Sequence, residues 1–302
     1  MAAKSAIINQ GAQMAVKPEL IAIVGPTASG KTALAIDIAE RFNGEIICAD
    51  SRTVYKGMDV GTAKPTLAEQ ARVRHWGLDL VEPNERFSVA DFKAYAGHAI
   101  ADIQARGKIP LLVGGSGLYV DAVMYDFTFG TAVNKKQRQK LESMSLEQLV
   151  NYCVKNNIPL PKNDKNKRHV ISSIERSGHD PISKSQLKHN HYIVGIATKM
   201  NTLRTRIETR TEHIFESNVE EEASILGKKY GWNSEAMTGN IYPLLKKHLE
   251  EGVALAEIKD QFSTLDYQLA KRQMTWLRRN PDIMWASLAD ARVYLERLFT
   301  SE

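Results

Sequence analysis

Apolar residues along this chain fall into two alternating patterns. Four short and mostly apolar runs have the length of buried β-strands, and they occupy residues 20–24, 45–51, 109–113 and 192–196. The segments between the first three runs repeat apolar residues every three or four positions, which is the spacing of one helix face. Strands that alternate with helices in this order predict an α/β fold, with a parallel sheet flanked by helices.

The helices between these strands have recognisable boundaries. Apolar residues at helical spacing predict the first helix over 34–42, and Gly44 provides its stop. The next helix is predicted to begin after Ser88, an N-cap candidate with Asp91 three residues later, and to end before Gly107. Each of these helices therefore connects two strands of the predicted sheet.

Farther along the chain, helical patterns dominate. One long amphipathic helix is predicted over 203–226, with Arg206 and Arg210 four residues apart on a shared face. The stretch 244–298 also has helical spacing. We therefore expect a helical C-terminal part beside the sheet.

Composition divides the chain into three parts. Residues 1–17 lack a long apolar core and carry few basic groups, so we expect a disordered tail and no targeting signal. Residues 18–130 and 191–302 form the predicted core. Over 131–190 apolar residues thin out and basic residues accumulate, which predicts an inserted helical module. A solvated appendage that binds nothing is the alternative interpretation of this module.

The residues after the first strand match a phosphate-binding loop, G-x-x-x-x-G-K-T. They are Gly25, Pro26, Thr27, Ala28, Ser29, Gly30, Lys31 and Thr32. Glycines allow backbone N–H groups to turn toward an anion, Lys31 adds a positive charge, and the Thr32 hydroxyl can hold Mg²⁺. Such loops are common in nucleotide-binding and ATP-binding proteins, but the motif itself indicates a bound phosphate chain and does not specify ATP.

Two further predicted strands lead to polar side chains that could take part in a reaction. The second strand leads to Asp50, and the third leads to Ser116, and the carboxyl ends of parallel strands share the edge where active sites collect. Glycines within 114–117 are expected to let the backbone approach a ligand closely, and 52–65 is predicted to be a polar loop at the same edge. Asp50 could remove a proton from an acceptor, and a turn-forming acid is the structural alternative.

The overall composition is that of an ordinary globular protein. The chain has 302 residues, of which 43% are apolar, and this is sufficient for a full core. Its formal net charge of +5 permits a polyanionic partner, although an ordinary basic surface explains it equally well. The distant cysteines Cys48 and Cys153 favour neither disulfides nor zinc, which fits the cytoplasm. No apolar run has the length of a membrane span, so no membrane association is expected.

Six motifs together resemble those of the tRNA dimethylallyltransferase family, also called tRNA isopentenyltransferases or IPP transferases. They occur in the family's order, and the sequence Gly-Thr-Ala-Lys-Pro at 61–65 is more diagnostic than the phosphate-binding loop. The motifs occupy residues 25–32, 50–51, 55–65, 87–92, 112–119 and 270–276. The resemblance implies a P-loop NTPase-like core. It also implies transfer of a dimethylallyl group from dimethylallyl diphosphate to N6 of adenine 37, next to the anticodon of tRNA, with release of diphosphate.

The resemblance also implies roles for individual residues. Lys31 and Arg210 are expected to meet the diphosphate, with Thr32 helping to place Mg²⁺, and Asp50 is expected to take a proton from the adenine amine. Ser116 stands where the family usually has a threonine beside the target base. The positions that match tRNA contacts of the family are Asp50, Ser51, Arg52, Thr53, Ser116, Arg168, His169 and Ser172.

Some residues depart from the family's pattern. His169 and Ser172 replace two arginines of a basic motif in the inserted module, and Asn240 falls where the family has a Gly-Tyr-Arg segment. These changes predict a tRNA set or affinity different from that of typical members. No cysteine and histidine cluster follows Trp276, which favours the bacterial type over the eukaryotic type with its zinc finger. The family further suggests a monomer that binds the anticodon stem-loop.

Three other functions are compatible with parts of the pattern. Prenyl transfer to free adenine nucleotides needs the same phosphate-binding loop, but a small acceptor has no use for a basic module. An ATP-dependent small-molecule kinase would use the same loop and base with an alcohol acceptor. A non-catalytic RNA-binding protein with a vestigial site would explain the altered basic motif, although the presence of Lys31, Thr32 and Asp50 argues against it.

Overall fold

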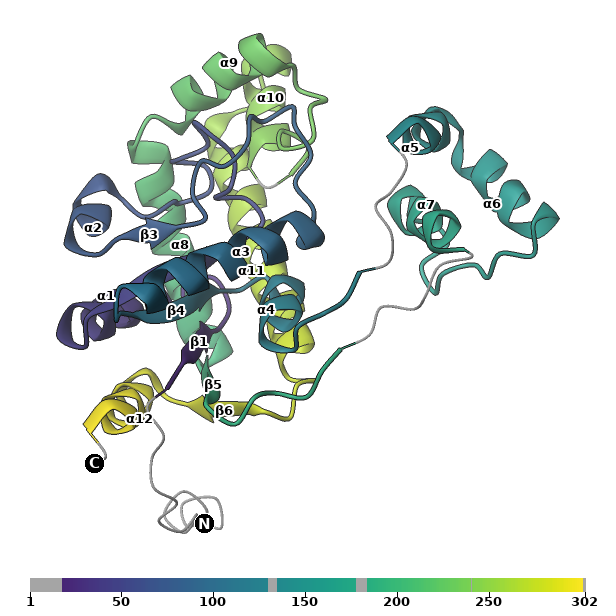
Figure 1. Ribbon diagram of the computed structural model, residues 1–302. Coiled ribbons are helices and arrows are strands. Elements are labelled where there is room, and N and C mark those ends of the chain that lie inside the picture. The colour runs from purple at the N-terminus through teal and green to yellow at the C-terminus, as the bar shows by residue number, and fades with distance from the viewer. Residues whose placement is uncertain (1–17, 130–134, 178–183, 240, 301–302) are drawn as a thin grey trace. The chain divides into compact units, whose positions relative to one another are not determined.

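The computed structural model describes residues 18–129, 135–177, 184–239 and 241–300 (Figure 1). The tail predicted for residues 1–17 and the departure at Asn240 lie outside the described residues. The chain divides into two compact units: the first comprises Met1–Tyr125 and Leu187–Glu302, and the second comprises Asp126–Gln186.

The first unit contains a parallel sheet, with six strands among the described residues in the order β3-β2-β4-β1-β5-β6. The strands are β1 (Leu20–Val24), β2 (Gly44–Ala49), β3 (His75–Trp76), β4 (Ile109–Gly114), β5 (His191–Ile196) and β6 (Ile283–Ala286). Gly114 is in register with both Val24 and Ala49, and Val24 is also in register with Gly195. The carboxyl ends of the four central strands therefore lie at one edge, and the predicted α/β fold with a parallel sheet is confirmed.

Helices pack against the sheet because its strands are apolar on both faces. The described helices of this unit are α1 (Lys31–Arg41), α2 (Leu67–Arg72), α3 (Val89–Ala105), α4 (Gly117–Met124), α8 (Met200–Glu216), α9 (Val219–Tyr230), α10 (Tyr242–Glu251), α11 (Leu255–Leu277) and α12 (Leu288–Thr300). Ile21 and Ile23 of β1 share an apolar cluster with Leu34 of α1 and Leu295 of α12. Because side chains alternate along a strand, the intervening residues face the other side of the sheet, and α3 and α4 contact β4.

The predicted start of α3 is confirmed by its cap. The Ser88 hydroxyl accepts a hydrogen bond from the backbone N–H of Asp91 at 3.3 Å, and the Asp91 carboxylate accepts one from the backbone N–H of Ser88 at 2.8 Å. This reciprocal capping box satisfies two N–H groups that the helix itself leaves without partners. It fixes the point at which the chain enters α3.

Two of the helical predictions are wrong in detail. The helix predicted over 203–226 is interrupted, because α8 ends at Glu216 and Asn218 adopts a left-handed conformation with φ of 60° before α9 begins. The stretch 244–298, predicted to be helical, contains the strand β6 between α11 and α12. Neither change moves the predicted site, but β6 adds an edge strand next to β5.

A second apolar core joins the loop after β2 to the helices α8 to α11. Met58 of the loop is fully buried in this cluster together with Tyr242 at the start of α10. The Glu222 carboxylate on α9 accepts hydrogen bonds from three successive backbone N–H groups of the loop, those of residues 59, 60 and 61, at 2.7–2.9 Å. The predicted polar loop over 52–65 is therefore anchored at a defined position.

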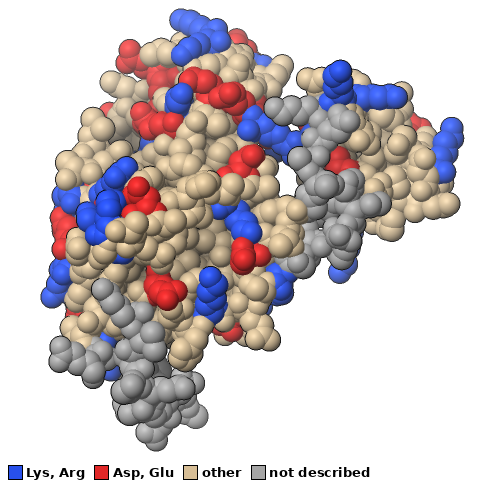
Figure 2. All heavy atoms as spheres, in the orientation of Figure 1, with Lys and Arg blue, Asp and Glu red and all other residues tan. Residues whose placement is uncertain are grey.

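The second unit contains three helices among its described residues. They are α5 (Lys135–Ser143), α6 (Leu146–Lys155) and α7 (Lys167–Arg176). Their common core is small, and Arg138 of α5 forms a buried ion pair with Glu175 of α7 within it. Figure 2 shows lysine and arginine side chains on the visible surface of this unit with few acidic side chains among them. In the described part of the whole chain, no helix combines the length and the apolar character that crossing a membrane requires.

Candidate active site

The Gly25–Thr32 segment forms a tight loop between β1 and α1. Ala28 and Gly30 adopt left-handed conformations with φ of 60° and 90°, and α1 begins directly after Gly30. The Ser29 N–H donates to the carbonyl of Pro26 at 3.3 Å, which closes the first turn of the loop. This geometry places the N-terminus of α1, with its free N–H groups, at the carboxyl edge of the sheet, where an anion binds favourably.

Two arginines of α8, a helix far away in sequence, hold this loop in place. Arg206 of α8 donates to the carbonyls of Ala28 and Ser29 at 3.4 and 3.2 Å. Arg210, one turn later, donates to the Thr27 hydroxyl and to the Thr62 carbonyl. The spacing of four residues thus brings both arginines to the loop, as their shared helix face predicts.

The third support of the loop comes from α11. The Gln273 side-chain oxygen accepts a hydrogen bond of 2.8 Å from the Thr27 N–H. Lys31 donates to the Pro26 carbonyl at 3.2 Å, so its ammonium group has a neutral partner in the protein. The loop is therefore preorganised by contacts that do not involve a ligand.

Asp50 and Ser116 meet beside this loop because β2 and β4 are neighbours in the sheet. Asp50 directly follows β2, and one of its carboxylate oxygens accepts a hydrogen bond of 2.8 Å from the Arg52 N–H. Ser116 follows β4, and its hydroxyl accepts a hydrogen bond of 3.2 Å from the Ser51 N–H. Arg52 also reaches the Ala236 carbonyl at 3.4 Å, which ties this wall to the second apolar core.

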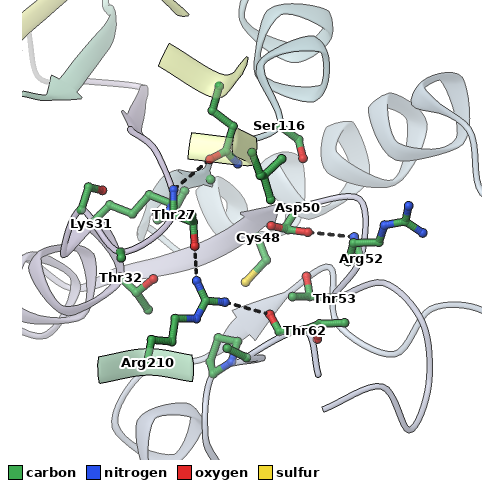
Figure 3. Close-up of a pocket in the computed structure, with 18 of the residues that line it drawn as sticks. Thr27, Lys31, Thr32, Cys48, Asp50, Arg52, Thr53, Thr62, Ser116 and Arg210 are labelled. Carbon is green, nitrogen blue, oxygen red and sulfur yellow. Dashed lines mark hydrogen bonds between the residues drawn. The ribbon is translucent and has the colours of Figure 1, made fainter. Parts of the chain in front are cut away.

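A single cavity of about 630 Å³ connects the loop to this wall. The predicted site residues that line it are Thr27, Ala28, Ser29, Gly30, Lys31, Thr32, Asp50, Ser51, Arg52, Thr53, Ser116 and Arg210. Figure 3 shows the Asp50, Thr32 and Arg210 side chains around a shared space. Gly25 and Pro26 form the start of the loop and do not line the cavity. The structure thus brings together, around one cavity, the residues predicted to bind the diphosphate and to act on the acceptor.

The electrostatics of the cavity favour a bound anion. Burial lowers the pKa of Lys31 to about 8, and the nearby Asp50 carboxylate partly offsets this effect. An arriving anion would stabilise the charged ammonium. Burial raises the pKa of the Cys48 thiol to about 12, so this cavity residue stays protonated and is a poor nucleophile.

The glycines at the end of β4 are required by the packing of the protein itself, and Gly114 also lines the cavity. A Cβ atom on Gly114 would lie 2.0 Å from the Ala49 carbonyl oxygen, and one on Gly117 would lie 2.1 Å from the Trp276 ring. A Cβ atom on Gly115 would lie 2.4 Å from the Gln273 side chain. Their small size allows β2 and α11 to approach the strand end.

The predicted tRNA contacts of the inserted module lie on α7 in the second unit. Arg168 and His169 are exposed there, and Ser172 is partly buried. They do not contribute to the cavity lining, which belongs to the first unit. The structure therefore groups the predicted residues into a cavity and a separate helical surface.

Sequence reasoning missed the roles of several residues that line the cavity or support its loop. The spacing of Arg206 and the place of Gln273 in the 270–276 motif do not reveal that both hold the phosphate-binding loop. Asp266 of α11 also lines the cavity. Its signal is an acid on the buried stripe that Phe262 and Ala270 continue at intervals of four residues.

The donor groups in the cavity are suited to Mg²⁺. Among the described residues, no group of three or more His, Cys, Asp or Glu side chains could by itself hold a metal ion. The Thr32 hydroxyl and the Asp50 carboxylate line the same cavity, however, and Mg²⁺ commonly binds one or two protein oxygens together with waters and substrate phosphates. The residues present fit an ion that arrives with a phosphorylated ligand.

Comparison with known proteins decides the family. The profile of the family described as IPP transferase matches residues 53–280, and that of the family described as isopentenyl transferase matches residues 18–80. This chain belongs to the IPP transferase family. The resemblance predicted from the six motifs is confirmed.

Individual relatives agree with this assignment. The chain is 37% identical over 273 residues to a tRNA dimethylallyltransferase of Streptococcus agalactiae, covering 88% of this chain and 91% of the relative. It is 34% identical over 284 residues to a tRNA dimethylallyltransferase of Bacillus licheniformis, covering 89% and 90%. These relatives are transferases, so the predicted enzyme class of this chain is confirmed.

Solved structures show the same fold. The tRNA isopentenylpyrophosphate transferase of Bacillus halodurans superposes with a TM-score of 0.71 at 32% identity, covering 94% of this chain and 97% of that one. A eukaryotic dimethylallyltransferase acting on tRNA also gives a TM-score of 0.71, at 25% identity, covering 93% of this chain and 76% of that one. The core is therefore the P-loop NTPase-like core of this family.

Proposed function

We propose that this chain transfers the dimethylallyl group of dimethylallyl diphosphate to N6 of adenine 37 in the anticodon loop of tRNA and releases diphosphate. The observation that carries the proposal is the single cavity in which the phosphate-binding loop faces Asp50. Membership of the IPP transferase family supports it independently. Leaving group and acceptor base have to share one space for this reaction, and the cavity provides it.

The phosphate-binding loop would stabilise the leaving group. As the bond between the prenyl carbon and the diphosphate oxygen breaks, its electron pair passes to the diphosphate. Lys31, Arg210 and the N–H groups at the start of α1 can take up the developing charge. Thr32 would hold Mg²⁺ together with the diphosphate oxygens, and the ion would supply further neutralisation there. Arg206 and Gln273 keep the loop in shape throughout.

Asp50 would act on the acceptor. The exocyclic amine of adenine is a weak nucleophile because its lone pair is delocalised into the ring, so loss of a proton during attack lowers the barrier. The Arg52 N–H occupies one carboxylate oxygen, which orients the group and leaves the other oxygen for the amine. The new carbon–nitrogen bond forms at N6, and the displaced proton ends on Asp50.

Ser116 would position the base. Its hydroxyl oxygen accepts from the Ser51 N–H, so the hydroxyl proton remains available to a ring nitrogen of adenine. The target base must leave its stack to enter a cavity of this kind, and an unpaired anticodon loop makes this step inexpensive. The basic α7 surface that carries Arg168 would contact tRNA phosphates, and the resemblance supports a monomer that acts in the cytoplasm.

A competition between acceptors tests the proposal. The chain is incubated with labelled dimethylallyl diphosphate, Mg²⁺ and an equal concentration of tRNA and AMP, and the products are separated by size. We expect the label in tRNA. Label confined to AMP would establish the free-nucleotide transferase instead. Phosphate transfer from ATP to an alcohol, without any use of the prenyl donor, would establish a kinase.

A further inference from the structure

Asp266 is a buried acid in the cavity that the mechanism above does not use. Its side chain on α11 is 3% exposed, and it lines the same space as Lys31 and Arg210. A carboxylate removed from water is costly unless nearby positive charge compensates it. On this buried helix stripe an apolar residue would pack without that cost, so the acid requires another explanation.

The geometry argues against a role in holding Arg210. The Arg210 guanidinium and the Asp266 carboxylate approach to 3.8 Å, which is too long for a hydrogen bond. The orientation of Arg210 is set by its two hydrogen bonds, to the Thr27 hydroxyl and to the Thr62 carbonyl. Asp266 therefore acts on this region through its charge.

Two acids reduce the positive charge that Lys31 and Arg210 present beside the loop. The groups that act electrostatically on Lys31 are Asp50, Arg210 and Asp266, so two cations face two acids. A diphosphate carries several negative charges, and without Asp266 it would meet a more positive set of side chains. Asp266 lowers that attraction, because charges interact strongly in a partly enclosed cavity.

We propose that Asp266 is a counter-charge that weakens the hold of the site on diphosphate and so speeds release of this product. The inference rests on the proposed function, in which diphosphate is the leaving group. A site that stabilises a departing anion through Lys31 and Arg210 also retains that anion after the reaction. A fixed carboxylate beside Arg210 limits this retention without disturbing the phosphate-binding loop.

The test uses the full chain, inorganic diphosphate as the probe and a fixed Mg²⁺ concentration. Asp266→Asn keeps the shape and removes the charge, and we expect the Kd for diphosphate to fall by about 10-fold or more in isothermal titration calorimetry. The KM for dimethylallyl diphosphate should fall with it, and kcat should fall where product release limits turnover. A residue needed only for structure would give weaker binding.

Two control variants and a second neutral variant isolate the charge. Asp266→Glu keeps it and should bind diphosphate within about 3-fold of the wild type. Asp260→Asn removes an exposed acid from the same helix and should leave the affinity unchanged. If Asp266→Asn does not fold, Asp266→Ser provides a second neutral side chain for the same titration.

The outcomes separate this inference from the proposed function. If the wild type binds diphosphate and both neutral variants bind it equally or more weakly, the counter-charge is refuted and the proposed function stands. If neither the wild type nor the neutral variants bind diphosphate, both are refuted. Tighter binding by the neutral variants, with Asp260→Asn unchanged, supports the counter-charge.

Discussion

The two ends of β2 treat buried charge in opposite ways. At the amino end, the Glu45 carboxylate is 2% exposed and accepts hydrogen bonds from Trp76, Arg106 and Lys108 at 2.5–2.9 Å. The Arg106 guanidinium, followed by Lys108 and Trp76, lowers the pKa of Glu45 to about 2. Every partner this carboxylate needs is supplied by the protein, so the charge stabilises the folded state.

At the carboxyl end, the charged groups have fewer and weaker partners among the described residues. Lys31 donates to a backbone carbonyl, and burial lowers its pKa to about 8. Asp50 has the Arg52 N–H on one oxygen, and Asp266 has Arg210 at 3.8 Å. The structural end of the strand thus satisfies its charge within the fold, whereas the functional end reserves its charges for a ligand.

The largest effect is expected at the functional end, from Asp50→Asn. The amide can still accept from the Arg52 N–H, so the wall keeps its shape while the base is lost. Turnover on tRNA should fall by about 10²-fold or more, with the affinity for dimethylallyl diphosphate retained. Steady-state kinetics with labelled donor would measure both. Near-normal turnover would show that another group takes the proton.

Lys31→Met separates stability from function at the same end. A pKa lowered from 10.5 to about 8 means that the charged side chain destabilises the empty fold. We expect the free energy of unfolding of the variant to exceed that of the wild type by about 1–3 kcal/mol at pH 7, and we expect the variant to lose diphosphate binding.

Proton linkage fixes how the stability difference between Lys31→Met and the wild type changes with pH. Between about pH 8 and 10.5 the unfolded chain binds the Lys31 proton more tightly than the folded chain, so the wild type gains stability as pH rises. Urea unfolding at pH 7 and pH 10 should therefore show a smaller difference in the free energy of unfolding between Lys31→Met and the wild type at the higher pH. A variant less stable than the wild type at pH 7 would contradict the comparison.

Glu45→Gln probes the structural end. It should lower the free energy of unfolding by about 1–3 kcal/mol at neutral pH, because the hydrogen-bonded charge is lost, and it should leave turnover within about 2-fold. The folded pKa is lowered, so the contribution is present above about pH 4.5 and is lost as pH falls toward about 2. Urea titrations across this range would test the prediction. A stability difference between Glu45→Gln and the wild type that does not change with pH would contradict a stabilising role of the Glu45 ion pairs.

The smallest effect is expected on the surface of the second unit. Arg168→Ala should weaken tRNA binding by about 3- to 10-fold and reduce the slope of log K against log salt by about 1. Lys155→Ala on α6, also an exposed basic residue of this unit, serves as the matched control. An unchanged slope for Arg168→Ala would remove this residue from the interface.

Much of the site was predictable because it follows from adjacency in a parallel sheet. Asp50 and Ser116 each come directly after a strand, and neighbouring parallel strands place such residues side by side. The phosphate-binding loop was readable from its local sequence. These features depend on few long-range contacts, and a single sequence contains them.

The remaining features depend on contacts that local patterns do not encode. β3 has two residues and β6 has four, so neither run is long enough to stand out. Apolar spacing continues across the break at Asn218, so periodicity alone could not detect it. Gln273 contacts a residue 246 positions earlier, and only the folded chain shows what it supports.

The central claim is that one cavity joins a departing diphosphate to an RNA amine activated by Asp50. Mass spectrometry of tRNA nucleosides tests it most directly, in cells that lack this activity and express either the wild type or Asp50→Asn. The account predicts a prenyl group on adenosine with the wild type and a nearly complete loss of it with the variant at equal protein levels. Unmodified adenosine with the wild type, or full modification with the variant, would contradict it.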